Sequence, residues 1–219
     1  MVANPSPTPP PFTLVVRDSA LILDLQKART VLSSAPYRGG LVQSQYIVNS
    51  TVAPDYCPPD VSLAISKQLE VLGLSTESST ACVTAVDVKN YVLAEATEGD
   101  FRCTAIVTMG IGNLSSPGLT PSAAYHSGTI NIIALIEAKL PSAALVEAVQ
   151  ILTEVKARLL IGRTTSDGYP ATGTSTDTVT LALMPGPLSD YCGAVTQVGR
   201  ALARASALAL QGAIDKIKT

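Results

Sequence analysis

Lys156 stands at a position in the sequence where a charge is not expected. Residues 141–160 predict a long helix, with a proline at the first helical position. At about 100° per residue, Lys156 falls within the apolar stripe of that helix, whereas Glu154 falls on the polar side and is typical of an exposed residue. A buried ammonium must be paired or directed into a polar cavity, unless its stem packs while its head reaches solvent. The pattern therefore leaves two interpretations: Lys156 snorkels, or it positions a substrate oxygen or a nearby carboxylate.

A second chemical feature is the hydroxyl-rich segment 171–177, with the sequence ATGTSTD. Gly173 permits unusual backbone angles, and Asp177 directly precedes a predicted strand. Such a loop can present N–H and O–H donors to an oxygen-rich ligand, although an ordinary polar loop capped by Asp177 is equally compatible with the pattern. The segment lacks the lysine of a P-loop, so the sequence gives little support for a phosphate cradle. Its hydroxyl residues are Thr172, Thr174, Ser175 and Thr176.

Two further candidates lie at the predicted strand 128–137. His126 is the single histidine of the chain, and its near-neutral pKa makes it the natural group for proton transfer. A packed or surface histidine without chemistry is the other interpretation. Asn131 shares one row of the strand with Thr129, and a buried amide must be hydrogen-bonded. Asn131 is therefore either part of the core or a ligand of a site.

The sequence disfavours several common kinds of site. One histidine and scattered cysteines do not form a standard zinc site, so no metal ligands are expected. No G-x-S-x-G, H-E-x-x-H or G-x-G-x-x-G motif is present. Residues 1–12 lack the features of a signal peptide, and no cysteine pair has C-x-x-C spacing. We therefore expect a cytoplasmic protein with reduced, mostly core-packed thiols, which are Cys57, Cys82, Cys103 and Cys192.

Composition limits the class of protein further. The 219 residues are 47% hydrophobic and 15% charged, with a net charge of −2. This balance disfavours a disordered chain. The charge is also unsuitable for binding nucleic acid, which needs a surplus of Lys and Arg. No run of about 18 apolar residues is present, so we expect no membrane partner. The apolar residues must instead form a well-buried interior.

The elements that must position these residues form an α+β domain, with a mixed β-sheet packed with helices. A three-layer α/β sandwich is the alternative, because strand 128–137, helix 141–160 and strand 178–183 could form one βαβ unit. We expect a disordered Pro-rich tail over residues 1–12 and a single domain over 13–219. The other predicted strands are 13–17, 20–25, 41–52, 79–87, 91–95 and 102–110, and the other predicted helices are 60–72 and 189–214.

Two adjacent segments together resemble a known family. Residues 128–160, GTINIIALIEAKLPSAALVEAVQILTEVKARLL, and residues 171–182, ATGTSTDTVTLA, are similar to the adenosylcobinamide amidohydrolases, the CbiZ family. The family typically carries a GTIN-type strand, a T-E-A-K run and an ATGTGTD loop. Here the run is TEVK, and Ser175 stands where a glycine is usual. Upstream segments that include Asn49 and Asn113 follow the family's order of motifs, so the resemblance covers about residues 38–185.

The resemblance implies hydrolysis of the amide that joins aminopropanol to the corrin ring of adenosylcobinamide, giving adenosylcobyric acid in cobalamin salvage. The corrinoid is then the substrate, and no separate cofactor is expected. We assign Asp177 or His126 as the base toward water, and Lys156 as the group that stabilises the oxyanion or orients Asp177. A Thr or Ser nucleophile in segment 171–177 is the rival mechanism. The expected substrate-binding residues are Thr172, Gly173, Thr174, Ser175, Thr176, Asn131, Thr129, Glu154, Asn113 and Asn49.

Two other classes of function remain open at this stage. A corrinoid-binding protein would use the same pocket without hydrolysis, and it would return the corrinoid unchanged. An oligomeric structural protein would instead use the Ala-rich helix over residues 195–214 as a subunit interface and would bind no corrinoid. A homo-oligomer is also compatible with the enzyme.

Overall fold

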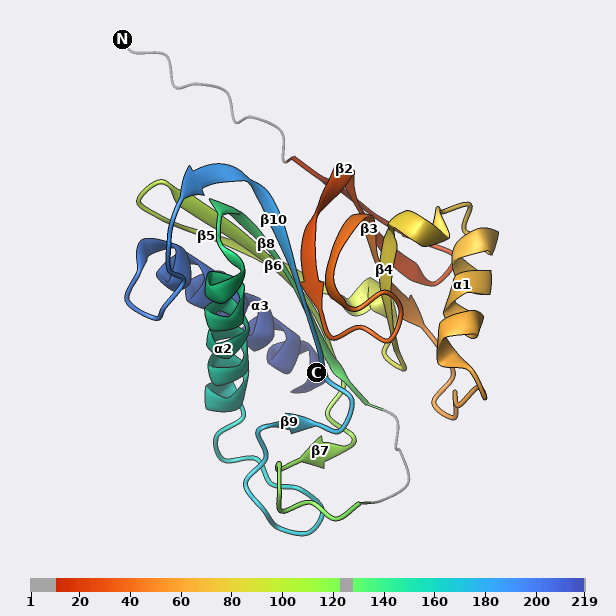
Figure 1. Ribbon diagram of the computed structural model, residues 1–219. Coiled ribbons are helices and arrows are strands. Elements are labelled where there is room, and N and C mark those ends of the chain that lie inside the picture. Colours follow the sequence, from red (N-terminus) through yellow and green to blue (C-terminus); the bar gives the residue numbers. More distant parts are fainter. Residues whose placement is uncertain (1–10, 123–127, 219) are drawn as a thin grey trace.

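The protein is built on an eight-stranded mixed sheet. The computed structural model describes residues 11–122 and 128–218 (Figure 1). The order across the sheet is β4–β3–β2–β10–β8–β6–β5, and β1 pairs with β2 outside this path. The neighbours β3 and β4, and β8 and β10, are parallel, whereas the other pairs are antiparallel. The strands are β1 (Thr13–Arg17), β2 (Ala20–Ser33), β3 (Gly40–Thr51), β4 (Ser79–Thr84), β5 (Val92–Glu98), β6 (Phe101–Met109), β8 (Ile130–Lys139) and β10 (Thr178–Leu188).

Helices make the two parallel connections and cover the sheet on different sides. Helix α1 (Val61–Val71) connects β3 to β4, and α2 (Ser142–Leu159) lies between β8 and β10, as expected for parallel neighbours. The final helix, α3 (Gln197–Lys218), lies beside α2 on the face formed by β5, β6, β8 and β10 (Figure 1). The predicted α+β class is confirmed, and the predicted βαβ unit forms within the mixed sheet. Short elements complete the chain: β7 (Leu114–Ser115), β9 (Gly173–Thr174) and two 3₁₀ turns, Thr76–Ser78 and Val88–Asn90.

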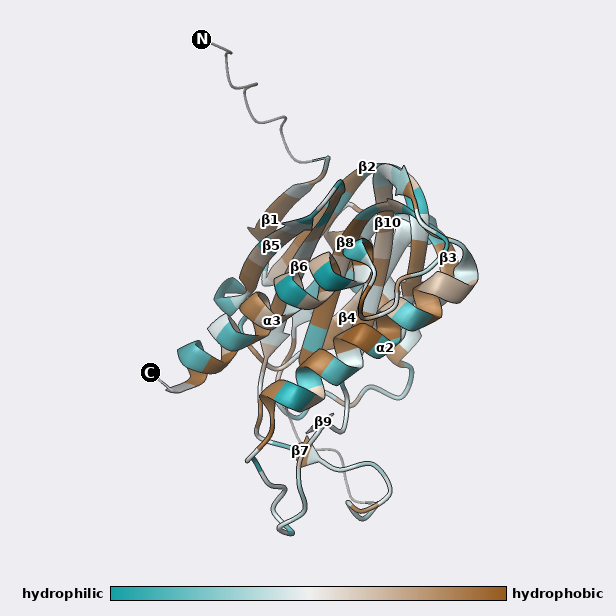
Figure 2. Ribbon diagram, turned by 90° about the vertical axis from the view of Figure 1, so that its left-hand side faces the viewer, coloured by the Kyte–Doolittle hydropathy of each residue, from teal (hydrophilic) through white to brown (hydrophobic). Residues whose placement is uncertain are grey.

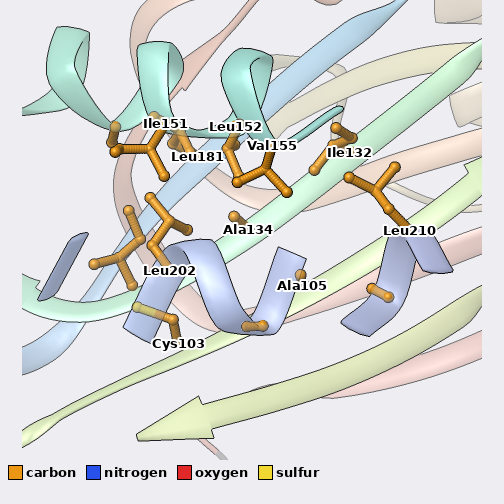
Figure 3. Packing of buried hydrophobic residues seen from close by; sticks show 14 of the residues in the cluster. Cys103, Ala105, Ile132, Ala134, Ile151, Leu152, Val155, Leu181, Leu202 and Leu210 are labelled. Atoms are coloured by element: carbon orange, nitrogen blue, oxygen red, sulfur yellow. The ribbon is translucent and has the colours of Figure 1, made fainter. Parts of the chain in front are cut away.

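Strand β8 is covered on both faces, as its two apolar rows predict. Ile132 and Ala134 belong to the cluster that faces α2 and α3. Ile133 and Leu135 belong to a second cluster, which includes residues of β2 and β3. Figure 3 shows the first of these clusters, in which side chains of α2 and α3 meet over β8 and β10. Asn131 is therefore an exception within an otherwise apolar stretch of β8.

Helix α3 uses small residues to lie close to the sheet. Ala201, Ala205 and Ala209 are buried in the same cluster as residues of β6. Figure 2 shows α2 and α3 in front of the sheet, with teal residues on both helices. The apolar face that a structural oligomer would have used is therefore covered by the protein's own sheet.

Three element boundaries differ most from the sequence-based prediction. Strand β2 continues to Ser33 through an irregularity between Asp24 and Arg29, where Gln26 has a φ of +65°. Strand β10 does not end at the prolines. It passes through them with a shift of register, because a strand tolerates prolines where regular ladder pairing is interrupted. Helix α3 begins at Gln197 rather than residue 189, and the Thr196 hydroxyl accepts a hydrogen bond from Gly199 N (3.0 Å), as a helix N-cap does.

Within the described ranges, no helix is both long enough and apolar enough to span a bilayer. The disordered Pro-rich tail expected over residues 1–12 falls largely outside these ranges and stays a prediction. The single-domain assignment for residues 13–219 stays a prediction.

Candidate active site

An ion pair between α2 and β10 forms the centre of the candidate site. Lys156 lies in the last turn of α2, and Asp177 directly precedes β10. The ammonium Nζ bonds to Asp177 Oδ2, and each of the two side chains is only 11% exposed. Lys156 therefore does not snorkel. It is directed at a carboxylate, which is one of the two interpretations that its helical position left open.

The Asp177 carboxylate is held by four donors. The backbone N–H of Ile130, at the start of β8, donates to Oδ1 over 3.0 Å. The backbone N–H of Thr174 donates to Oδ2 over 3.1 Å, and the Thr174 hydroxyl donates to Oδ1. With Lys156, these donors occupy the roughly four acceptor positions of a carboxylate. Asp177 is thus fixed by the start of β8, by β9 and by α2. Its carboxylate can accept a bond from another donor only if one of these partners moves.

The loop backbone at position 173 lies so close to the ion pair that only a glycine fits there. A Cβ atom at this position would lie 2.4 Å from Asp177 Oδ2 and 2.8 Å from Lys156 Nζ. The predicted reason, an unusual backbone angle, is wrong, because Gly173 does not have a positive φ. The glycine instead lets the loop backbone pass directly against the two charged groups.

The remaining hydroxyls of segment 171–177 are mostly bonded within the protein. The Thr176 hydroxyl donates to Gly128 O (2.9 Å), and Asn113 Nδ2 donates to the Ser175 hydroxyl (2.8 Å). The backbone N–H of Thr172 donates to the carbonyl of Ser115, beside the β7–β9 pair. These bonds tie the loop to segment 110–115 and to the start of β8. Ser175 and Thr176 remain exposed, so the loop still faces solvent.

Behind the ion pair, on the opposite face of the sheet, lies a buried network of amides. Asn131 is fully buried, and its Nδ2 donates to Asn49 Oδ1 (3.0 Å) and to Val83 O (3.1 Å). Its Oδ1 accepts from the Thr178 hydroxyl (2.9 Å). Asn49 Nδ2 in turn donates to the Thr108 hydroxyl (2.9 Å). Asn131 and Asn49 are therefore brought together within the core. Their assignment as substrate ligands stays a prediction.

Sequence reasoning missed Thr178 and Thr108 as part of this network. Both are register partners of Asn131, Thr108 in β6 and Thr178 in β10. Side chains in register on adjacent strands lie on one face of a sheet, so the three polar residues form one row. A strand-pairing scheme would have revealed this row, but the periodicity of each strand alone does not.

The other predicted site residues are placed differently. Thr129 lies at the edge of the network, with its hydroxyl 2.8 Å from Thr176 O and 3.1 Å from Asn131 Oδ1. Glu154 is exposed, and no described contact connects it to Lys156. His126 falls outside the described residues, so its assignment as a base stays a prediction.

The cysteines do not provide a nucleophile in the core. All four are free, and all except Cys57 are buried, as predicted. Burial raises the pKa of the Cys82 thiol to about 12, and it raises the pKa of the Cys192 thiol to about 12 as well. Burial also raises the pKa of Cys103 well above its usual range. These three thiols are protonated at neutral pH, and the thiolate is the nucleophilic form. Over residues 11–122 and 128–218, no group of three or more His, Cys, Asp or Glu residues is placed to hold a metal ion.

A groove lies at the other end of the same strands. It has a volume of about 660 Å³ and is lined by the carboxyl ends of β8 and β10 and by β2, including Lys139 and Arg29. Strand β8 has ten residues, so at about 3.3 Å per residue this groove lies roughly 30 Å from the ion pair. None of the predicted site residues within the described part of the chain lines it. We place the site at the ion pair, because the groove brings together no comparable set of bonded groups.

The comparisons with known proteins agree with the resemblance in the motifs. The family model described as adenosylcobinamide amidohydrolase matches residues 11–219. An adenosylcobinamide amidohydrolase of Methanosarcina mazei is 30% identical over 202 residues, covering 87% of this chain and 91% of that protein. One of Halobacterium salinarum is 25% identical over 216 residues, covering 93% and 87%. Among solved structures, the PH0078 protein from Pyrococcus horikoshii OT3 matches with a TM-score of 0.48 and 12% identity, over 93% of this chain and 82% of that one. The chain belongs to the adenosylcobinamide amidohydrolase family.

Proposed function

We propose that this protein hydrolyses the amide between aminopropanol and the corrin ring of adenosylcobinamide, releasing adenosylcobyric acid and aminopropanol. Family membership supplies the reaction. The Lys156–Asp177 pair is the observation that assigns this reaction to a site. The family-like segment 171–177 supplies Asp177, and its Gly173 lies directly against both charged groups. The corrinoid is the substrate in this proposal, and no cofactor is included.

Amide hydrolysis needs a nucleophile, stabilisation of the oxyanion and a proton for the departing amine. Lys156 has three N–H donors, and the bond to Asp177 occupies one of them. We assign another to the oxyanion that develops on the scissile carbonyl. The low exposure of the pair strengthens this interaction, because fewer waters compete for the charge.

Two routes differ in the atom that attacks. In one, Asp177 takes a proton from a water molecule, the water oxygen attacks the carbonyl carbon, and the C–N bond breaks as the departing amine takes up that proton from Asp177. In the other, the Thr174 oxygen attacks, its proton passes to Asp177, and the C–N bond breaks as the amine takes up a proton. Water then hydrolyses the resulting ester and regenerates the hydroxyl. The geometry favours the second route, because the Thr174 hydroxyl already donates to Asp177, whereas a water would have to displace a donor.

Rapid-quench mass spectrometry of the intact protein distinguishes these routes. The Thr174 route predicts a transient adduct with the mass of the corrinoyl ester, which is absent from a Thr174→Val variant. If no adduct forms while Thr174→Val retains the wild-type rate, the direct attack of water is correct.

Incubation of the purified protein with adenosylcobinamide, without added metal, tests the function itself. We expect adenosylcobyric acid and aminopropanol in equal amounts, and the same rate after dialysis against a chelator. A corrinoid-binding protein would return adenosylcobinamide unchanged, which would overturn the proposal. A rate that disappears on dialysis and returns with a metal ion would keep the reaction but add a cofactor. The cytoplasmic location stays a prediction, which fractionation of the source cells would test.

A further inference from the structure

We propose that Thr178 is a positioning residue for the reaction, acting through Asn131 to fix the Asp177 carboxylate. This inference rests on the proposed function. Asp177 and Thr178 are adjacent in the chain, at the start of β10, and successive side chains of a strand point to opposite faces of the sheet. Asp177 bonds to Lys156 on the helix side, while Thr178 bonds to Asn131 on the other side. The same short stretch of backbone thus carries the reacting carboxylate and its anchor.

The anchor itself is fixed from three directions. Asn131 Nδ2 donates to Asn49 Oδ1 of β3 and to Val83 O of β4, over 3.0 and 3.1 Å. Its Oδ1 accepts from Thr178 of β10 over 2.9 Å. Because Asn131 is fully buried, none of these bonds competes with bulk water. The Thr178 hydroxyl is therefore held in place by the other half of the sheet.

The bond between Thr178 and Asn131 sets the distance between the Ile130 N–H and the Asp177 carboxylate. Ile130, the residue before Asn131, donates its N–H to Asp177 Oδ1 over 3.0 Å. Asn131 and Thr178 are register partners, so their bond fixes how the start of β8 stands against the start of β10. If that bond is lost, the Asp177 carboxylate can shift relative to Ile130, Lys156 and Thr174. A displacement of about 1 Å in a catalytic group can cost up to roughly 100-fold in rate.

Strand β10 offers a matched control two residues further on. Thr180 lies on the same face of the strand and is buried, and its hydroxyl is 2.7 Å from the Ser33 hydroxyl. Thr178→Val and Thr180→Val each remove one buried hydroxyl of β10 and keep the side-chain shape. They differ in that only Thr178 is connected to Asn131. Loss of a buried hydrogen bond is common to both, so a difference in turnover reports on positioning.

Steady-state kinetics with adenosylcobinamide test the inference. We expect Thr178→Val to lower kcat by roughly 10- to 100-fold while KM stays within about threefold, because the contact acts on the transition state rather than on binding. Thr180→Val should stay within about threefold of wild type, and Thr178→Ser should recover most of kcat. Thermal unfolding is followed in parallel. If Thr178→Val does not fold, Thr178→Ala replaces it in the same comparison with Thr180→Ala.

The kinetic results distinguish failure of this inference from failure of the proposed function. A larger loss of kcat in the Thr178 variant than in the Thr180 variant, with recovery by serine, supports the inference. Equal kcat in the two variants, or a loss seen only in KM, overturns it while the proposed function stands. If the wild-type protein forms no adenosylcobyric acid, the proposed function fails instead, and the inference fails with it.

Discussion

The two ends of the β8–β10 pair offer opposite combinations of space and chemistry. At their amino ends, Lys156 and Thr174 both donate hydrogen bonds to Asp177, and the Lys156 and Asp177 side chains are largely buried. At their carboxyl ends lies a groove of about 660 Å³, and its charged residues Arg29, Lys139 and Asp190 take part in no ion pair among the described residues. Ligands of open α/β sheets usually bind at the carboxyl ends of parallel strands. In this protein, both that topological rule and the groove point away from the site that we propose at the ion pair.

Among substitutions of the residues around Asp177, the largest expected effect comes from replacing Lys156 by methionine. We expect Lys156→Met to lower kcat/KM for adenosylcobinamide by roughly 1,000-fold, because the oxyanion loses its donor and Asp177 loses its counter-ion. Activity is measured well below the unfolding midpoint, since the unpaired carboxylate also destabilises the fold. Lys67→Met, at an exposed position of α1, is the matched control and should keep wild-type activity. Activity in Lys156→Met close to that of the control would remove the ion pair from the site.

A methyl group at Gly173 should cause the next largest loss of activity. A Cβ atom would lie 2.4 Å from Asp177 Oδ2, so Gly173→Ala must push the loop away from the ion pair. We expect a loss of roughly 100-fold in kcat with a smaller change in KM. Gly168→Ala, which meets no atom within 4 Å although its φ is +84°, is the control for substitution in the same loop region. A wild-type kcat in Gly173→Ala would show that the close approach has no part in the reaction.

The smallest expected effect is at the other end of the strands. Arg29→Gln in the groove should change kcat/KM for adenosylcobinamide by less than about twofold, since the groove lies roughly 30 Å from the ion pair. The same assay that is used for the Lys156 variant measures it. A loss comparable to that of Lys156→Met would reverse the comparison and move the site to the groove.

Much of the fold could be predicted from local patterns. The two apolar rows of 128–137 indicated a strand covered on both sides, and the helix over 141–160 is correct to within a residue or two at each end. The errors lie where tertiary contacts override local signals. Residues 26–33, QKARTVLS, include charged residues and form the second half of β2 because they pair with β3 and β10. The prolines of β10 are accommodated by a shift of register that no local pattern shows.

The sequence predicted several residues of the candidate site but not the contacts between them. The helical position of Lys156 indicated that it needs a partner, and Asp177 was a candidate. Their sequence separation of 21 residues gave no indication that the helix end and the strand start meet. Gly173 was selected for its backbone freedom, whereas its role depends on space that only the folded chain creates. Thr178 became visible only through its register with Asn131.

The most direct test of the account is product analysis by liquid chromatography and mass spectrometry for the wild-type protein and Asp177→Asn. The substitution keeps the size of the side chain, but it places an amide N–H₂ or a neutral oxygen where Lys156 and two bonds from Thr174 meet a carboxylate. We expect equal amounts of adenosylcobyric acid and aminopropanol from the wild type, and a rate at least roughly 1,000-fold lower from a folded Asp177→Asn. Wild-type product formation by Asp177→Asn would contradict the account.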